Sequence, residues 1–418
     1  MKIGFLSLPM TGHLNPMTAL ARKMQSRGHD ILFFGIPDVE PFARAANLPF
    51  VPFCEEDYPT GSITKIFGTV ATLQSNDDWK RNMMTPSLLK VMPEGLRRKL
   101  EENKVDAMVI DKGHLFMELV PMSLGIPYVH IWTILHMDVS GATPVCVFPW
   151  PHETTDEAHA RNIAGVKQLQ KLLAPAADSA KIYAEKYGLQ IDWDNPRATH
   201  SKLAEITQTP REFDFSNIPW PATFHYAGPF HDDDGREKIA FPWQKLNGKP
   251  LIYASLGTLV NGIEKIYNTI LTAAASLPST QLVLSIGNNV NADALSPVPA
   301  GAIIVRKAPQ IALLKRAALC ITHAGINTVL ESLAQGVPMV ALPITFDQPG
   351  IASRIAFHRV GEYITFESLT ANRLLESIQK VLDDSEYANK ARYLQQIIID
   401  THGLDTAASI VEQALLGQ

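Results

Sequence analysis

The sequence is poor in cysteine and lacks any long apolar run. Its three cysteines, Cys54, Cys146 and Cys320, are far apart and show no C-x-x-C spacing, which excludes a disulfide framework and a structural zinc site. No stretch approaches the roughly 20 apolar residues that a membrane span requires. The apolar run after Lys2 is too short for a signal peptide. We therefore expect a soluble, cytoplasmic protein with no transmembrane segment, for which peripheral membrane contact stays open.

An excess of charge of one sign is also missing. Lys and Arg together number 37 and Asp and Glu 42, which gives a formal net charge of −5 over 418 residues. A dedicated nucleic-acid binder usually carries a basic surface, so we expect no nucleic-acid partner. The hydrophobic share of 46% and the charged share of 19% are typical of globular proteins. The length predicts two domains.

Two common nucleotide-binding motifs are absent. There is no G-x-x-x-x-G-K-[ST], which excludes a P-loop ATPase, and no G-x-G-x-x-G follows the first predicted strand, which argues against a dinucleotide oxidoreductase. His130 and His136 are six residues apart, whereas a zinc pair on a helix needs a spacing of four. We therefore expect neither a zinc site nor a redox cofactor.

Short apolar runs alternate with helical stretches along most of the chain. The N-terminus predicts a strand over residues 3–8, a loop, and a helix with Asn15 as its N-cap, Pro16 in its first position and Gly28 after its end. A second buried strand over residues 30–36 completes a βαβ unit, which implies a parallel sheet. Further strands are predicted at 50–53, 107–110, 128–132, 251–255, 281–286, 303–305, 319–322 and 338–342, and further helices at 87–101, 115–124, 262–276, 311–317 and 328–335.

A polar, turn-rich segment interrupts this alternation near the middle of the chain. We therefore predict an α/β protein of two doubly wound, Rossmann-like domains facing one another across a cleft. The N-terminal domain spans residues 1–230 and an interdomain linker spans 231–249. The C-terminal domain spans 250–400, and residues 401–418 form a helix that packs back on the N-terminal domain.

The segment Ile321–Glu331 (ITHAGINTVLE) is the most informative in the second half. A strand ends, a turn of small residues follows, and a helix starts with Asn327 placed to cap it. A helix N-terminus suits a diphosphate, and His323 stands at the carboxyl end of the strand, where open α/β sheets bind ligands. Glu331 is placed to accept hydrogen bonds from ribose hydroxyls. The plain alternative is a tight strand-to-helix turn with a satisfied histidine.

Two further turns follow strands at the same edge of the predicted sheet. Asp347 and Gln348 place an acid beside an amide, a combination suited to sugar hydroxyls. The turn Ser255-Leu256-Gly257-Thr258 offers a hydroxyl and bare backbone to a phosphate. These turns strengthen the interpretation of the HAGINT segment as a nucleotide-sugar site.

Together, these elements resemble the donor-binding signature of the UDP-glycosyltransferases of glycosyltransferase family 1, whose fold is called GT-B. The matching elements are Pro309-Gln310, His323-x-Gly325-x-Asn327-Thr328-x-x-Glu331, Gly336-Val337-Pro338 and Asp347-Gln348. The resemblance implies that His323 and the backbone of Asn327 and Thr328 hold the diphosphate. It implies that Gln310 and Glu331 hold the ribose, and Asp347 and Gln348 the hexose. Lys307 and Ile326 stand where plant members of the family carry tryptophan.

His13 is the predicted catalytic base, in the motif Thr11-Gly12-His13-Leu14-Asn15-Pro16. A histidine near a helix N-terminus is favoured in its neutral form, which can take a proton from an acceptor hydroxyl. Asp111 directly follows a predicted strand and would orient the imidazole, as in hydrolase triads. The family resemblance supports both roles. The alternatives are a loop histidine that binds backbone and an aspartate that caps a strand end.

The first half is rich in methionine and aromatic residues, most of which we expect in the core. Five of them are predicted to line an apolar acceptor site in the N-terminal domain: Met84, Phe116, Trp132, Met137 and Phe148. The run Asp232-Asp233-Asp234 could indicate a metal-binding D-x-D motif, but it lies in the predicted linker, where a solvated loop is the simpler interpretation. The segment Asp192-Trp193-Asp194 has no strand context and is interpreted in the same way.

The sequence therefore predicts an inverting enzyme that needs no metal or other cofactor and uses a UDP-sugar as co-substrate. It would transfer a hexose, with glucose favoured by the resemblance, to a hydroxyl or nucleophilic aromatic carbon of a small apolar acceptor. Flavonoids, polyketides, macrolides and carotenoids are examples of such acceptors. A nucleotide-sugar epimerase of the same fold and a non-catalytic module that binds sugar nucleotides or lipids are the alternatives. The sequence names neither the acceptor nor the oligomeric state.

Overall fold

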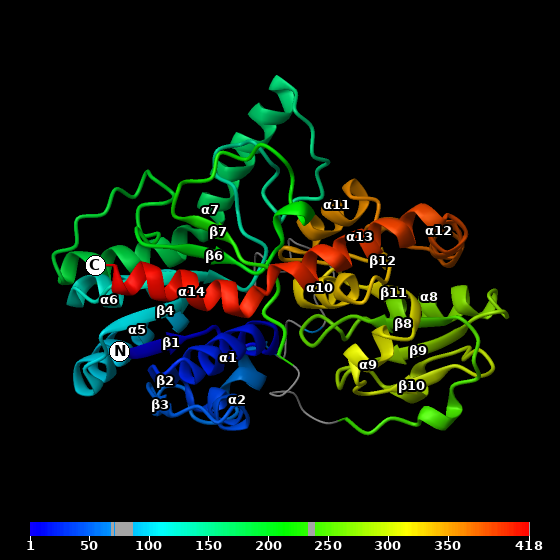
Figure 1. Ribbon diagram of the computed structural model, residues 1–418, viewed down its shortest axis with the longest axis horizontal. Helices are drawn as coiled ribbons and strands as arrows, with labels where there is room; N and C mark the ends of the chain where they lie inside the picture. Colours follow the sequence, from blue (N-terminus) through cyan, green and yellow to red (C-terminus); the bar gives the residue numbers. More distant parts are fainter. Residues whose placement is uncertain (68–70, 72–86, 233–238, 418) are drawn as a thin grey trace.

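A computed structural model describes residues 1–67, 71, 87–232 and 239–417, without the side chains of residues 66, 67 and 87–91. It contains two parallel β-sheets, one in each half of the chain, each covered by helices on both faces (Figure 1). The predicted α/β class with two doubly wound sheets is confirmed. Among the described residues, no helix is long and apolar enough to cross a membrane.

In the described part of the N-terminal half, the sheet has seven strands in the order β3-β2-β1-β4-β5-β6-β7. Its strands are β1 Lys2–Leu6, β2 Asp30–Gly35, β3 Phe50–Pro52, β4 Ala107–Asp111, β5 Tyr128–Trp132, β6 Glu205–Thr207 and β7 Phe224–Tyr226. Its helices are α1 Thr11–Ser26, α2 Glu40–Ala45, α3 Ser62–Phe67, α5 Ser87–Asn103, α6 Leu119–Leu124 and α7 Asp156–Lys186, with short 3-10 turns η1 Pro37–Val39 and η3 Arg211–Phe213. The central strands β1 and β4 are apolar apart from Lys2 at the start of β1 and Asp111 at the end of β4, because helices bury both faces of the sheet.

The second sheet has six strands in the order β10-β9-β8-β11-β12-β13. Its strands are β8 Leu251–Ser255, β9 Gln281–Ser285, β10 Ile303–Val305, β11 Ala317–Thr322, β12 Met339–Ala341 and β13 Gly361–Tyr363. The helices are α8 Glu264–Ala275, α9 Gln310–Leu314, α10 Ile326–Ala334, α11 Gln348–Phe357, α12 Ala371–Asp383, α13 Ser385–Thr401 and α14 Gly403–Leu416, with 3-10 turns η4 Trp243–Lys245, η5 Ala292–Ala294 and η6 Phe366–Ser368.

Two helix starts differ from the prediction. Helix α1 begins at Thr11 after Met10, so Asn15 is not its N-cap and Pro16 lies inside the helix. Helix α10 begins at Ile326 after Gly325, so Asn327 does not cap it. Asn327 looks like a local cap in the sequence, but its side chain contacts the other half of the molecule, as described below.

Several elements were not predicted from the sequence. Strands β6 and β7 are only three residues long, and β6 begins with the fully buried Glu205, so neither forms an apolar run. Helix α7 is 31 residues long and begins after Thr155, whose hydroxyl accepts the backbone N–H of Ala158. It packs against α5 and α6 on the outside of the N-terminal half.

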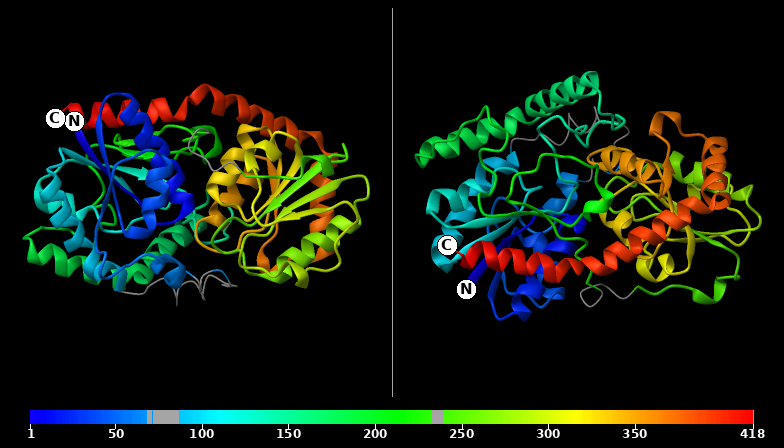
Figure 2. Two further views of the ribbon diagram at one scale, coloured as in Figure 1. Left: turned by 90° about the horizontal axis from the view of Figure 1, so that it is seen from below. Right: turned by 45° about the horizontal axis from the view of Figure 1, so that its top comes forward.

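The last helix returns to the N-terminal half. Helices α13 and α14 run across both halves, and α14 lies beside α1, close to the N-terminus (Figure 2). Ala407, Ala408 and Val411 of α14 are fully buried in the N-terminal core. At the surface, Arg27, directly after α1, pairs with Asp405 and Glu412.

Candidate active site

Each sheet has one place where the strand order reverses, and the predicted site residues lie at these two places. In the first sheet β1 neighbours β4, and in the second β8 neighbours β11. Ligands of open α/β sheets bind at such a switch point, outside the carboxyl ends of the strands. Asp111 ends β4 and Ser255 ends β8, while His323 follows β11 directly. The carboxyl edges of the two sheets face one another, because hydrogen bonds join residues that border them across the two halves.

His13 and Asp111 form a buried pair at the first switch point. His13 lies in the first turn of α1, and its Nδ1 is 2.8 Å from Oδ2 of Asp111. The hydroxyl of Thr133, directly after β5, donates to Oδ1 of Asp111 at 2.7 Å and lies 2.7 Å from His13 Nδ1. Since Asp111 only accepts and Thr133 has already given its proton, Nδ1 must carry the proton of the neutral ring. The lone pair of Nε2 is then available as a base.

Asp111 is held as a carboxylate by its surroundings. Burial alone would raise its pKa, but the charge of His13 and hydrogen bonds from His13, the Leu8 backbone and Thr133 bring the pKa below its ordinary value. The N–H of Gly113 donates to its Oδ1 at 2.9 Å. A Cβ at Gly113 would lie 2.6 Å from Cε1 of His13, so this position must be glycine for the pair to form. The local geometry therefore supports a general base with a fixed tautomer.

His323 lies between two glycines at the second switch point. A Cβ at Gly257 would approach its Cε1 to 2.5 Å and a Cβ at Gly325 to 2.6 Å, and Gly257 has a φ of +74°. Burial lowers the pKa of His323 to about 4, although a hydrogen bond with the Ser255 backbone acts in the opposite direction and raises it. Its Nδ1 is buried without a hydrogen-bond partner among the described residues. An orphaned buried nitrogen of this kind is rare and is one that an anionic ligand would satisfy.

The two residues predicted to hold ribose lie together. Gln310 donates from Nε2 to Oε2 of Glu331 at 2.7 Å and to Oγ1 of Thr328 at 3.3 Å. The hydroxyl of Tyr253 donates to Oε1 of Gln310 at 3.0 Å. Glu331 is only 4% exposed, on the first turns of α10. This small network fixes the carboxylate before any ligand is present.

Asn327 has a different position from the one predicted. It is the second residue of α10, and its side chain contacts the other half of the chain rather than the helix end: Nδ2 donates to the carbonyl of Gly12 at 2.6 Å. Ser255 is buried, and its hydroxyl accepts the N–H of Gly257 at 3.3 Å. Thr258 is exposed at the same turn. Ser255 is paired with Thr322 across β8 and β11, so this turn lies at the same sheet edge as His323.

Asp347 and Gln348 are placed at the start of α11. The carboxylate of Asp347 accepts the backbone N–H of Leu135, from the N-terminal half, at 2.8 Å. Burial raises the pKa of Asp347, opposed by that hydrogen bond and by the charge of His13. Asp347 and His13 contact the same short segment, at Leu135 and Thr133 respectively. Oε1 of Gln348 accepts the N–H groups of Ile344 and Thr345 at 2.8 and 3.0 Å. The amide nitrogen of Gln348 makes no hydrogen bond among the described residues.

The predicted acceptor residues are not all brought together. Met137 and Phe148 both pack under α7, in a cluster around Val145, Val166 and Leu169. Phe116 instead packs against Trp193, with ring centroids 6.1 Å apart. Met84 lies outside the described residues.

Trp132 does not belong to an acceptor site. It is 1% exposed, and its Nε1 donates to Glu205 at 3.2 Å. A side chain enclosed in this way is not available to an acceptor, which corrects the prediction for Trp132.

The aspartate run yields no metal site in the described chain. Asp232 pairs with Arg22 of α1 at 3.1 Å, while Asp233 and Asp234 lie outside the described residues. Asp192 accepts the N–H of Asp194 in an exposed turn. Among the described residues, no group of three His, Cys, Asp or Glu side chains is arranged to hold a metal ion.

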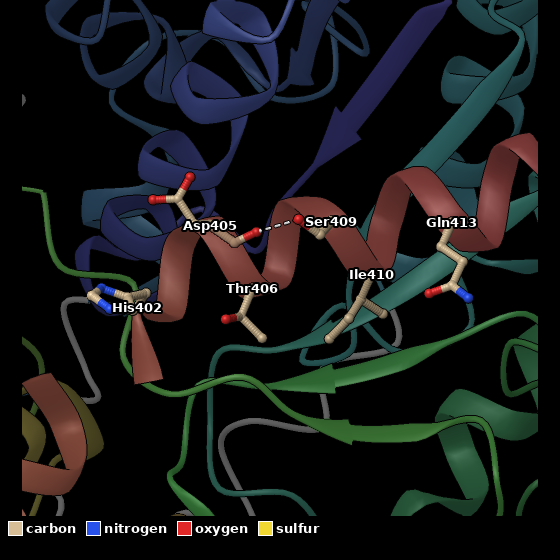
Figure 3. A pocket seen from close by; sticks show the side chains of 6 residues that line it. All are labelled: His402, Asp405, Thr406, Ser409, Ile410 and Gln413. Carbon is tan, nitrogen blue, oxygen red and sulfur yellow. Dashed lines mark hydrogen bonds between the residues drawn. The ribbon is translucent and has the colours of Figure 1, made fainter. Parts of the chain in front are cut away.

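A surface groove occurs elsewhere, along the last helix. Figure 3 shows its lining, which comes only from α14 and His402 before it: His402, Asp405, Thr406, Ser409, Ile410 and Gln413. It contains none of the predicted site residues.

Three contributors to the site were missed from the sequence. Thr133 completes the His13–Asp111 pair, Gly113 leaves room for it, and Gln208 joins Thr133 to Asn327. The position of Thr133, directly after a predicted strand, was a usable signal. Gln208 follows β6, which the pattern did not reveal.

Known proteins of similar sequence are glycosyltransferases. Residues 231–414 match the model of the family described as "UDP-glucoronosyl and UDP-glucosyl transferase". Zeaxanthin glucosyltransferase of Pantoea ananas is 26% identical over 418 residues, which cover 97% of this chain and 94% of that protein. The enzyme of the same name from Pseudescherichia vulneris is 28% identical over 413 residues, 98% of this chain and 97% of that protein.

The fold has close counterparts among solved structures. The crystal structure of the glycotransferase of kitacinnamycin superposes with a TM-score of 0.76 at 23% identity, over 99% of both chains. Because the family model and the curated relatives over nearly the whole chain are glycosyltransferases, the epimerase and the non-catalytic binding module are set aside. The C-terminal half of the chain matches the UDP-glycosyltransferase family, the fold is GT-B, and the protein is a glycosyltransferase that transfers a sugar from a nucleotide sugar to a small-molecule acceptor.

Proposed function

We propose that this enzyme transfers a hexose, preferably glucose, from a UDP-sugar to a small apolar acceptor with inversion at the anomeric carbon and without a metal ion. The observation that carries the proposal is the buried His13–Asp111 pair beside Asp347. The pair leaves Nε2 of His13 as a base, and Asp347 comes from the half that matches the UDP-sugar family model. Base and sugar ligand thus meet at one place.

The reaction is a single in-line displacement. Nε2 of His13 takes the proton of the acceptor hydroxyl while the oxygen forms its bond to the anomeric carbon. The bond from that carbon to the diphosphate oxygen breaks on the opposite face, and UDP leaves with both electrons. The His13 imidazolium that results is stabilised by Asp111, whose pKa is held low. A nucleophilic aromatic carbon can replace the hydroxyl.

Protein groups would carry the charge that develops on the diphosphate. The backbone N–H groups at the start of α10, the hydroxyl of Thr258 and the ring of His323 are placed at the second switch point. The orphaned Nδ1 of His323 fits this role, since a phosphate oxygen would satisfy it. Preorganised donors of this kind can replace a metal ion.

The acceptor is proposed to lie along the loop between β5 and α7. This loop carries Thr133, which contacts His13, and Leu135, which contacts Asp347. Farther along it, Met137 and Phe148 form an apolar cluster with α7. Two relatives of the whole chain are zeaxanthin glucosyltransferases, which supports glucose as the sugar and a carotenoid-like or similarly apolar alcohol as the acceptor class.

A mass-spectrometric screen of UDP-sugars against apolar alcohols and polyphenols tests the proposal. We expect products heavier by one hexose, most abundant with UDP-glucose, and none with His13→Ala. From an α-configured donor, the NMR coupling of the anomeric proton should show a β-glycoside. An α-product would contradict inversion, and products unaffected by His13→Ala would contradict the assigned base.

A further inference from the structure

The carbonyl of Gly12 lacks its usual partner within its own helix. In α1 it would accept the backbone N–H of residue 16, but Pro16 has none. Nδ2 of Asn327, from the other half of the molecule, donates to this carbonyl instead, at 2.6 Å. Gly12 directly precedes His13, and Asn327 lies in the first turn of α10, where the diphosphate is proposed to bind. This one hydrogen bond therefore joins the backbone of the base to the donor site.

The other end of the same side chain leads back to the base by a second route. Oδ1 of Asn327 accepts a hydrogen bond from Nε2 of Gln208 at 3.0 Å. Nε2 of Gln208 also donates to the backbone carbonyl of Thr133 at 2.8 Å, so both of its protons are used. Thr133 is the residue whose hydroxyl fixes His13 and Asp111. Gln208 is 2% exposed.

We propose that Gln208 is a positioning residue that, through Asn327 and Thr133, sets the distance between the base and the bound UDP-sugar. This role rests on the proposed function. Gln208 itself has no proposed contact with donor or acceptor and follows β6 in the N-terminal half. Its two hydrogen bonds close a ring that runs through Thr133, His13, Gly12 and Asn327 and crosses the domain boundary twice. Loss of Gln208 leaves a carbonyl and an amide oxygen unpaired and opens this ring.

The expected cost is catalytic rather than a loss of donor affinity. A misplacement of about 1 Å between reacting groups can slow a reaction on the order of 100-fold. Removal of Gln208 should therefore lower the turnover number while the diphosphate and ribose contacts stay intact. Loss of a residue that merely stabilised the fold would lower thermal stability without lowering the turnover number selectively over donor affinity.

Gln208→Ala is the test, and Gln281→Ala is its matched control. Gln281 is also a buried glutamine whose Nε2 donates to two oxygens, the carbonyls of Lys245 and Gly301, but it lies at the start of β9, away from the site. We expect similar losses of melting temperature in both variants. Only Gln208→Ala should lose turnover, by roughly 10- to 100-fold at saturating UDP-glucose, with the Kd for UDP unchanged within about twofold. If Gln208→Ala does not fold, Gln208→Met keeps the side-chain volume without the donors.

A double-mutant cycle separates the proposed role from the alternatives. Because Gln208 is proposed to act through Asn327, Gln208→Ala combined with Asn327→Ala should lose little more turnover than the worse single variant. Full turnover in folded Gln208→Ala, an equal fall in UDP affinity, or additive losses would each overturn the role of Gln208. A folded wild type that transfers no sugar would instead overturn the proposed function, and this role with it.

Discussion

Arg354 of α11 donates from Nε and Nη2 to the same oxygen, Oδ1, of Asp214 in the other half of the chain, at 2.9 and 2.7 Å. Burial would raise the pKa of Asp214, but the charges of Arg354 and His136 hold it well below its ordinary value. Nearer the start of α11, the N–H of Gly350 donates to the carbonyl of Cys146 at 2.8 Å. The helix that begins at Gln348 is therefore held along its length by the N-terminal half.

His13→Ala should remove most transfer and leave donor affinity nearly unchanged, because the base and the donor site come from different halves. A general base contributes roughly 10²- to 10⁴-fold to the rate, and we expect a loss of turnover in this range. Isothermal titration with UDP-glucose, beside steady-state rates, checks both parts. A parallel loss of donor binding would show that His13 serves the donor instead.

Asp111→Asn should also slow turnover. The amide cannot accept from His13, Thr133 and the Leu8 backbone as the carboxylate does, so the imidazole loses its fixed tautomer. Steady-state rates against wild type are the measurement. Unchanged turnover in a correctly folded Asp111→Asn variant would rule out the pair as the catalytic unit.

Gly257→Ala should weaken UDP binding by displacing His323. Gly28→Ala is the control: Gly28 has a φ of +93°, but a Cβ there would have nothing within 4 Å, while a Cβ at Gly257 meets the His323 ring at 2.5 Å. Both variants carry the strain of a left-handed backbone, about 1 kcal/mol. Only Gly257→Ala should lose UDP affinity by titration; equal affinity in the two variants would refute a diphosphate role for His323.

Gln348→Glu should change which UDP-sugar is preferred while UDP binds normally. The substitution keeps an oxygen for the N–H groups of Ile344 and Thr345 and removes only the amide donor that is left for a sugar hydroxyl. Glu331→Ala should do the opposite and weaken UDP and every UDP-sugar alike. Titration of UDP, UDP-glucose and UDP-galactose separates the cases. Loss of UDP affinity with an unchanged sugar preference in Gln348→Glu would exclude it as a sugar ligand.

Transfer should continue in excess EDTA, because protein groups are proposed to meet the diphosphate charge. Initial rates before and after chelation, and after readdition of Mg²⁺ or Mn²⁺, are the measurement. A loss that either metal restores would reopen the question of the aspartate run that begins at Asp232.

UDP-glucose should bind with proton uptake near pH 6. The pKa of His323 is about 4 in the free protein, so the ring is neutral there, and an adjacent diphosphate would raise that pKa. Affinity should therefore rise as the pH falls from 7 toward 5. Titration in two buffers of different ionisation enthalpy measures the protons taken up. His323→Gln should abolish this uptake; if it persists, another group takes the proton.

The sequence predicted those parts of the site that depend on short local patterns. His323 and Gly325 could be placed because the turn between β11 and α10 is built from neighbouring residues, and Gly257 because it lies in a similarly local turn after β8. The start of α1 was predicted wrongly from Asn15 and Pro16, since Asn-Pro is a typical helix start. Helix α1 begins earlier, and the carbonyl of Gly12, which lacks its usual partner because of Pro16, is satisfied by Asn327, more than 300 residues away. Such partners are invisible to any pattern within one segment.

The buried charged residues could not be predicted from the sequence for the same reason, because their partners lie in other segments of the chain. Glu205 in β6 is paired with Arg197 and His200 and accepts from Trp132, so its burial depends on partners from other segments of the chain. A glutamate in a three-residue stretch predicts exposure when read alone. Trp132, which the sequence predicts to contact the acceptor, is instead buried and donates a hydrogen bond to Glu205.

The return of α14 to the N-terminal half constrains the order in which the molecule can be completed during synthesis. Ala407, Ala408, Val411 and Leu415 belong to the same core as the first strand. The ribosome delivers them only after the whole C-terminal half has emerged, so the first half must wait with part of its apolar surface uncovered. During that interval the C-terminal half can fold as a unit, and the nascent N-terminal half is the part that chaperones should bind.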